Sequence, residues 1–141
     1  MDEKESILIV DDDESTRRSL ALILGKKGYE AEVAGTGREA LEKARERFFN
    51  VTLLDIKLPD TEGVELLAPL KKMHPDMIVL MITGHASLES AVRTSLEGAL
   101  AYITKPLNMD SVLTAIKEAL EKQCRAMENR RRHEAAQREL A

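Results

Sequence analysis

The sequence is poor in aromatic residues, in net charge and in cysteine, and each shortage excludes a class of protein. Aromatic residues make up 3% of the 141 residues and tryptophan is absent, which argues against a surface that stacks bases or sugar rings. Charged residues make up 33%, yet the formal net charge is only -4, so no strong field attracts nucleic acid or an anionic membrane. We therefore expect neither nucleic acid nor a membrane as a direct partner.

Signals for secretion and membrane insertion are also missing. Cys124 is the only cysteine, which excludes an internal disulfide, and the charged segment 1–5 lacks the features of a signal peptide. No apolar run approaches the roughly 20 residues that span a bilayer. These observations predict a cytoplasmic protein, and 43% hydrophobic residues suffice for one domain with an aliphatic core.

Short apolar runs alternate with longer amphipathic stretches along the chain. The runs are too short and too continuously hydrophobic for half-exposed strands, so they predict buried parallel strands. The predicted strands are 7–10, 31–34, 51–54, 78–82 and 101–104. Glu32 interrupts the second run, as it would in an edge strand. Repeated strand-helix units with short connections predict an α/β fold, a doubly wound, flavodoxin-like (βα)5 sheet of order 2-1-3-4-5.

Helical patterns lie between the predicted strands. One buried helical face combines Ala40, Leu41, Ala44 and Phe48. Thr36 followed by Glu39 fits a capping box at the start of that helix. Pro69 falls within the next helical pattern, where its missing N–H predicts a kink or a delayed start.

The helical pattern continues after Leu120 to the last residue, but its apolar stripe thins. A polar helix of this kind is usually a connector, a weak coiled coil or a fraying end. We therefore divide the chain into a folded domain, residues 1–122, and a polar helical extension or linker, residues 123–141.

Acidic residues gather where two predicted strands end. Asp11, Asp12, Asp13 and Glu14 follow the first strand, and Asp55 closes the third. Neighbouring parallel strands lie about 4.8 Å apart, so these carboxylates should converge. Clustered carboxylates repel one another unless a hard cation sits among them, and Mg²⁺ prefers such oxygen ligands. For Asp13 and Glu14 alone, a role in starting the loop and capping the next helix is equally open.

A hydroxyl group and an ammonium group are predicted at the same edge of the sheet. Thr83 ends the fourth strand and Lys105 follows the fifth. Phosphoryl transfer needs a nucleophile, a cation and donors around the phosphoryl oxygens, which Asp55, Mg²⁺, Thr83 and Lys105 would supply. Alone, a Thr or Lys at a strand end is more often structural or solvated, but the combination is specific.

Four motifs carry a resemblance to a known family. They are Ile-Leu-Ile-Val-Asp11-Asp12, Leu-Leu-Asp55-Ile-Lys-Leu-Pro59 with Gly63, Met-Ile-Thr83-Gly, and Tyr102-Ile-Thr-Lys105-Pro106. In order and spacing, residues 5–122 resemble the response-regulator receiver domain family of two-component signal transduction. The resemblance implies a CheY-like phosphoprotein domain that catalyses only its own phosphorylation and dephosphorylation.

The resemblance also implies the chemistry of the site. Asp55 would receive phosphate from a phosphohistidine of a sensor histidine kinase or phosphotransfer protein. Mg²⁺ would be bound by Asp12, Asp55, the backbone carbonyl of Lys57 and, through water, Asp11. Lys105 would contact the phosphoryl oxygens.

The remaining implied roles concern structure and switching. The bond between Lys105 and Pro106 would be a cis peptide that directs the lysine. Thr83 would shift toward the phosphoryl group and Tyr102 would turn inward, altering the face formed by the fourth helix, fifth strand and fifth helix. That face would act on an unidentified downstream domain or protein, with the chain a monomer or a weak homodimer.

Two residues near the predicted site have open roles. Lys57 places a long cation beside Asp55, and His85 follows Thr83 and Gly84. Each is interpreted either as tuning phosphate lifetime or partner fit, or as a solvated side chain, which is common at the rim of a site.

An enzyme is the alternative interpretation. The segment from Ile9 to Ser15 also resembles the first motif of haloacid-dehalogenase-like phosphatases, with Asp11 as nucleophile. Against it, no acidic pair follows Lys105, the chain has no room for a cap domain, and Asp55 would have no role. A domain that docks partners without phosphorylation is a third reading, which the intact acceptor, acids, Thr and Lys disfavour.

Overall fold

The structure, a computed structural model, describes residues 4–84 and 88–140 and contains one parallel five-stranded sheet. The strands are β1 (Ser6–Val10), β2 (Glu30–Ala34), β3 (Val51–Asp55), β4 (Ile78–Thr83) and β5 (Ala101–Thr104). The helices are α1 (Glu14–Lys26), α2 (Gly37–Glu46), α3 (Val64–Met73), α4 (Leu88–Leu96) and α5 (Met109–Leu140). The strand order is β2-β1-β3-β4-β5, with every pairing parallel. The predicted fold and strand order are therefore confirmed, and β2 lies at an edge as Glu32 indicated.

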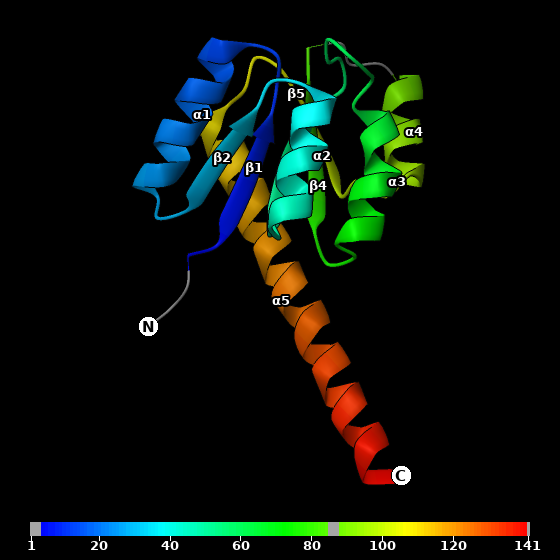
Figure 1. Ribbon diagram of the computed structural model, residues 1–141. Helices are drawn as coiled ribbons and strands as arrows, with labels where there is room; N and C mark the ends of the chain where they lie inside the picture. The colour runs from blue at the N-terminus through cyan, green and yellow to red at the C-terminus, as the bar shows by residue number, and fades with distance from the viewer. Residues whose placement is uncertain (1–3, 85–87, 141) are drawn as a thin grey trace.

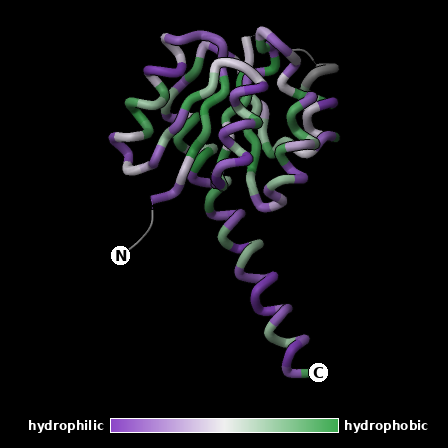
Figure 2. The backbone as a smooth tube through the Cα atoms, viewed as in Figure 1, coloured by the Kyte–Doolittle hydropathy of each residue, from purple (hydrophilic) through white to green (hydrophobic). Residues whose placement is uncertain are grey.

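Helices cover both faces of the sheet (Figure 1). Alternate residues of each strand point to opposite faces, so Ile7 and Ile9 pack with α1 and α5, whereas Leu8 and Val10 pack with α2 and α3. The strands form a hydrophobic layer between more polar helices (Figure 2). The sheet is thus buried on both faces, as its continuous apolar runs predicted.

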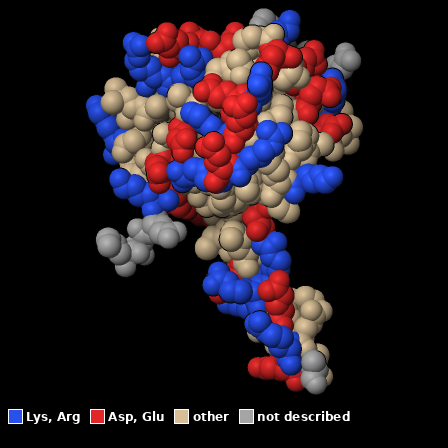
Figure 3. All heavy atoms as spheres, in the orientation of Figure 1, with Lys and Arg blue, Asp and Glu red and all other residues tan. Residues whose placement is uncertain are grey.

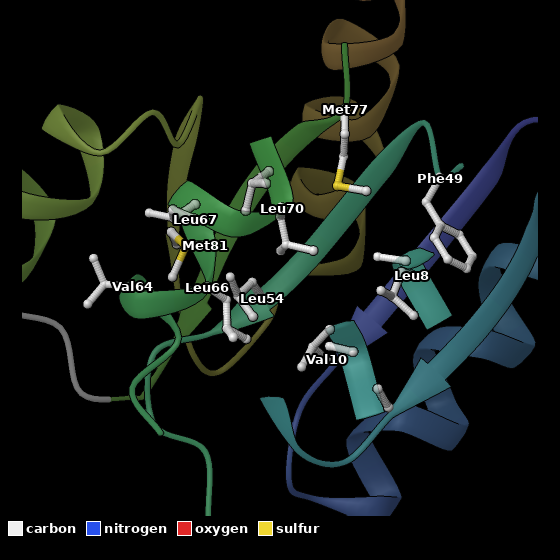
Figure 4. Close-up of a cluster of buried hydrophobic side chains, with 14 of the residues drawn as sticks. Leu8, Val10, Phe49, Leu54, Val64, Leu66, Leu67, Leu70, Met77 and Met81 are labelled. Carbon is white, nitrogen blue, oxygen red and sulfur yellow. The ribbon is translucent and has the colours of Figure 1, made fainter. Parts of the chain in front are cut away.

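The core on the α2 and α3 side is almost entirely aliphatic. Figure 4 draws Leu8, Val10 and Leu54 from the sheet and Leu66 and Leu70 from α3, all of them buried members of this cluster. Because this core anchors β1 and β3 from one face, it holds the ends of these two strands in a constant position.

Helix α2 begins as predicted but ends earlier. The Thr36 hydroxyl accepts a hydrogen bond from the Glu39 N–H at 3.1 Å, and the Glu39 carboxylate accepts one from Gly35 N–H at 2.7 Å. The helix ends at Glu46, and Arg47 is extended, with φ -157° and ψ 160°. The prediction that Phe48 continues the buried face of the helix is therefore wrong. The extended residue turns the chain so that Phe49 is fully buried and Phe48 only partly.

Pro69 lies inside α3 without delaying it. The helix begins at Val64 and continues past Pro69 to Met73. Pro69 removes one hydrogen bond in the helix interior, but four buried side chains anchor this helix to the core: Val64, Leu66, Leu67 and Leu70. Packing of the apolar face therefore maintains the helix where the local propensity of proline opposes it.

Helix α5 has 32 residues and leaves the domain halfway along its length. Asn108 precedes the helix and caps it, because its side chain accepts a hydrogen bond from Ser111 N–H at 3.2 Å. The side chains of Val112, Ile116, Ala119, Leu120 and Gln123 are buried. From there the helix projects away from the sheet with charged side chains along it (Figures 1 and 3). Among the helices described, none is long and apolar enough to cross a membrane.

Contacts at the amino edge of the sheet fix the point where α5 leaves. Gln123 Nε2 donates to the carbonyls of Asn50 at 2.9 Å and Asp76 at 2.7 Å, and its Oε1 accepts from Asn50 Nδ2 at 2.9 Å. Two turns further along α5, Arg130 pairs with Asp76 at 2.6 Å. The division of the chain near residue 122 stays a prediction, but the helix keeps polar contacts with the domain as far as Arg130.

Candidate functional site

The acidic residues meet at the carboxyl edge of the sheet, where β1 and β3 lie side by side and the strand order reverses. Asp11 follows β1 directly and Asp55 is the last residue of β3. One carboxylate oxygen each from Asp11, Asp12 and Asp55 lies within 4.8 Å of the others. Asp11 and Asp55 are buried, at 0% and 4% exposure, while Asp12 is exposed. The convergence expected from the strand ends is therefore present.

Lys105 lies between the two buried carboxylates. Its Nζ donates to Asp11 Oδ2 at 2.7 Å and to Asp55 Oδ2 at 3.1 Å. Its peptide bond to Pro106 is cis, as the resemblance implied. Three carboxylates thus lie close together and one ammonium bonds to two of them, which leaves a local excess of negative charge and oxygen atoms suited to a hard cation.

The site shifts the pKa of Asp55 and of Lys105. Burial raises the pKa of Asp55, and the charge of Asp11 adds to this, while the Lys105 ammonium and the Lys57 N–H oppose it. For Lys105, burial lowers the pKa, but Asp11 and Asp55 together outweigh burial and raise it. The lysine thus stays charged, and the ionised form of Asp55 is disfavoured until another positive charge is near.

The loop after β3 is held closely against the strand. Lys57 N–H donates to Asp55 Oδ1 at 3.3 Å, and the backbone of Lys57 pairs with that of Glu62. A Cβ atom on Gly63 would lie 2.0 Å from the Asp55 carbonyl oxygen, so only glycine permits this approach. The loop therefore positions the backbone of Lys57, an exposed residue, beside Asp55.

Asp60 ties the same loop to α2, and sequence reasoning missed it. Its carboxylate accepts hydrogen bonds from the N–H groups of Gly37 at 2.8 Å and Arg38 at 2.9 Å. These two bonds lower the pKa of Asp60, and its charge favours the amino end of the helix. No short motif indicates this contact, because the partners lie more than 20 residues apart.

The sequence left two roles open for Asp13 and Glu14, in a metal site or in capping the next helix. Their contacts in the structure are those of the start of helix α1. Asp13 caps α1, accepting from Ser15 N–H at 3.2 Å and from the Thr16 hydroxyl at 2.6 Å. The hydrogen bond from Thr16 is the main cause that lowers the pKa of Asp13. Glu14 pairs with Arg18 on the exposed face of the same helix.

Thr83 and Tyr102 lie further along the same edge. Thr83 is the fully buried last residue of β4 and pairs in register with Thr104, and its carbonyl accepts from Lys105 N–H at 2.7 Å. Tyr102 on β5 is partly buried and packs against the core that contains Met81. The predicted His85 lies outside the described residues.

The comparisons with known proteins agree with this geometry. The family described as the response regulator receiver domain matches residues 7–117. This chain belongs to that family. As a receiver domain it is part of two-component signal transduction, and domains of this family generally bind Mg²⁺ and work with histidine kinases and output domains. None of the comparisons supports the phosphatase alternative with Asp11 as nucleophile.

Individual relatives share both sequence and fold with this receiver domain. The transcriptional regulatory protein ZraR from Klebsiella oxytoca is 39% identical over 118 residues, which is 84% of this chain but 27% of that protein. A CheY-like receiver domain protein from Methanospirillum hungatei JF-1 is 48% identical, with a TM-score of 0.86 over 88% of this chain and 99% of that one. The beryllofluoride-activated NtrC4 receiver domain dimer is 41% identical, with a TM-score of 0.80 over 84% and 98%. The chain thus spans about a quarter of the curated relative's length.

Proposed function

We propose that this receiver domain accepts a phosphoryl group on Asp55 from the phosphohistidine of a sensor histidine kinase or phosphotransfer protein, in a Mg²⁺-dependent reaction. The observation that carries the proposal is the access of Asp55. It borders an open cavity together with Asp12, Lys57 and Lys105. Asp11, in contrast, is fully buried and is not among the residues that line this cavity.

The donor set fits Mg²⁺. Asp12 and Asp55 would bind it directly with the Lys57 carbonyl, and Asp11 would act through a bound water. Mg²⁺ prefers oxygen ligands and keeps several waters, and the excess of carboxylate over ammonium groups favours a divalent cation. When bound, the ion would neutralise charge on the phosphoryl oxygens.

Asp55 is the nucleophile in the proposed reaction. An oxygen of its carboxylate attacks the phosphorus atom, a P–O bond forms, and the P–N bond to the donor imidazole breaks. Lys105, placed beside Asp55 by the end of β5, donates to the phosphoryl oxygens. No further catalytic activity is proposed beyond phosphorylation and dephosphorylation of this aspartate.

The proposed switch uses Thr83, the last residue of β4, and Tyr102 on β5. The Thr83 hydroxyl would donate to the phosphoryl group, and Tyr102 would move inward, changing the face of α4, β5 and α5. That face, and the helical extension after residue 122, would act on an output domain or protein. The relatives that are transcriptional regulatory proteins support an output of that kind.

Intact-mass measurement and peptide mapping after treatment with acetyl phosphate test the proposal. With Mg²⁺ the protein should gain one phosphoryl group on the peptide that contains Asp55, and chelation of the metal should prevent this. Asp55→Asn should abolish the gain, whereas the control Asp60→Asn, altered in the same loop, should retain it. A phosphoryl group on Asp11, or persistent labelling of Asp55→Asn, would contradict the proposal.

A further inference from the structure

Arg17 on α1 reaches back toward the site across the amino end of its helix. The side chain is half-buried, and its Nη1 donates to the backbone carbonyl of Asp11 at 2.7 Å. The neighbouring Arg18 differs, because it is exposed and pairs only with Glu14 among the contacts described. The two adjacent arginines thus have different surroundings. Among the contacts described, Arg17 bonds to the acidic loop, residues 11–13, and Arg18 does not.

Gly35 provides the space that the guanidinium of Arg17 occupies. A Cβ atom at Gly35 would lie 3.1 Å from Arg17 Nη1 and 3.4 Å from Cζ. Gly35 is itself held, because its N–H donates to the Glu39 carboxylate at the start of α2. The guanidinium therefore lies between the β2–α2 connection and the acidic loop, and a larger residue at position 35 would crowd it.

The hydrogen bond from Arg17 to the Asp11 carbonyl bears on the peptide group that joins Asp11 to Asp12. The Asp11 carbonyl and the Asp12 N–H belong to one planar peptide group, so a donor on the carbonyl restrains that plane. The other side of Asp11 is restrained as well, because its N–H donates to the Ala34 carbonyl at 3.1 Å. Asp12 is exposed, so the direction of its carboxylate depends on the backbone from which it starts.

We propose that Arg17 is a positioning residue for the metal site, which sets the Asp11–Asp12 peptide so that the Asp12 carboxylate is directed toward Asp55. The inference rests on the proposed function, since it concerns the Mg²⁺ site of the same reaction. Arg17 touches no reacting atom, so its effect is on metal binding and not on the chemical step. Partners that orient metal ligands typically change metal affinity about 10-fold or more when removed.

Calorimetric titration with Mg²⁺ compares the two arginines directly. Arg17→Met keeps the apolar stem and removes the donors, and it should weaken Mg²⁺ binding about 10-fold. The matched control Arg18→Met should bind Mg²⁺ as the wild type does. At saturating Mg²⁺ the rate of phosphorylation by acetyl phosphate should return to the wild-type value in Arg17→Met. An affinity equal to that of Arg18→Met would overturn the inference.

A second variant separates positioning from general destabilisation. Gly35→Ala should weaken Mg²⁺ binding by crowding the guanidinium, and this effect should vanish when Arg17 is already methionine, because contacting residues are not additive. In the metal-free protein, both single variants should speed amide exchange of Asp13, whose N–H donates to Asp11 Oδ1. Additive effects of the two substitutions on affinity would overturn the inference, even if either variant were less stable.

The outcomes distinguish the inference from the function on which it rests. If wild type binds Mg²⁺ and is phosphorylated on Asp55 while Arg17→Met binds the ion equally well, only the positioning role fails. If wild type neither binds Mg²⁺ nor accepts phosphate, the proposed function fails, and the positioning role fails with it.

Discussion

At the amino edge of the sheet, the described polar side chains by which α5 contacts the domain are paired. At the carboxyl edge, in contrast, three carboxylates lie together and the Lys105 ammonium bonds to only two of them. The Gln123 side-chain amide accepts a hydrogen bond from Asn50 Nδ2 and donates one to the Asn50 carbonyl, and Arg130 forms an ion pair with Asp76. Asp11, Asp12 and Asp55 approach one another with a net negative charge.

The difference indicates that the amino edge of the sheet contributes to stability, whereas the carboxyl edge is suited to binding a ligand. A buried polar network in which hydrogen-bonding groups are satisfied supports a unique packing. A cluster of like charges opposes folding until a ligand compensates it, and perturbed groups of this kind tend to lie at functional sites. The amino edge is therefore expected to respond to mutation through stability, and the carboxyl edge through metal binding and phosphorylation.

The largest effect on stability is expected from Gln123→Ala. The substitution removes the buried Gln123 amide and leaves the partly buried Asn50 amide and the Asp76 carbonyl without this partner, so the free energy of unfolding should fall by about 1–3 kcal/mol. Urea unfolding measures this change. Gln137→Ala is the matched control, because Gln137 lies on the exposed part of the same helix, and its effect should be close to zero. Equal effects at the two positions would show that the network does not anchor α5.

A smaller effect should appear in the pH dependence of stability. Asp55 has a raised pKa, so in the folded protein it stabilises in its protonated form, and this contribution is lost as pH rises through the folded pKa, above the ordinary value of 3.8. Asp60 has a lowered pKa, so its contribution is present above the unfolded pKa and is lost as pH falls through the folded value.

Two variants in one loop should therefore behave oppositely. As pH rises through the carboxylate range, metal-free Asp55→Asn should gain melting temperature relative to wild type, and Asp60→Asn should lose it. Thermal melts over a series of acidic pH values check this. Differences of the same sign for both variants would mean that the charge at Asp55 is not disfavoured in the folded protein.

The smallest expected effect is local and concerns Thr83→Ala. With beryllofluoride as a phosphoryl mimic, wild-type amide exchange should change in α4 and β5, because only differential contacts of the bound group can shift the equilibrium. Thr83→Ala should still bind the mimic but should not show the change in those elements. A full response in this variant, or one confined to α2 and α3, would place the switch on another face.

Which features could be predicted depends on how local their signals are. Asp11, Asp55 and Lys105 were placed together because continuous apolar runs indicate buried parallel strands, and such strands end at one edge. The cap at Thr36 was also local, since its partner lies three residues away.

Contacts between distant loops left no readable pattern. Asp60 reaches Gly37, and Gln123 reaches Asn50 more than 70 residues away, only after the sheet has formed. Phe48 was misplaced for a related reason, because the extended conformation of Arg47 ends the helix where the apolar spacing favours another turn. Spacing along the chain reports which face of an element is buried, but not which side chain of another element will meet it.

Thermal melts of wild type and Asp12→Ala, with and without Mg²⁺, test most directly the claim that the carboxylates at the carboxyl edge are held together for a cation. Asp12 is exposed, so its removal leaves little unfilled space. The metal-free variant should melt at a higher temperature than wild type, because repulsion with Asp11 and Asp55 is relieved. Mg²⁺ at about 100 times its dissociation constant should stabilise wild type by about 2.7 kcal/mol and the variant far less. A metal-free variant that melts lower than wild type, together with an equal response of both proteins to Mg²⁺, would contradict the account.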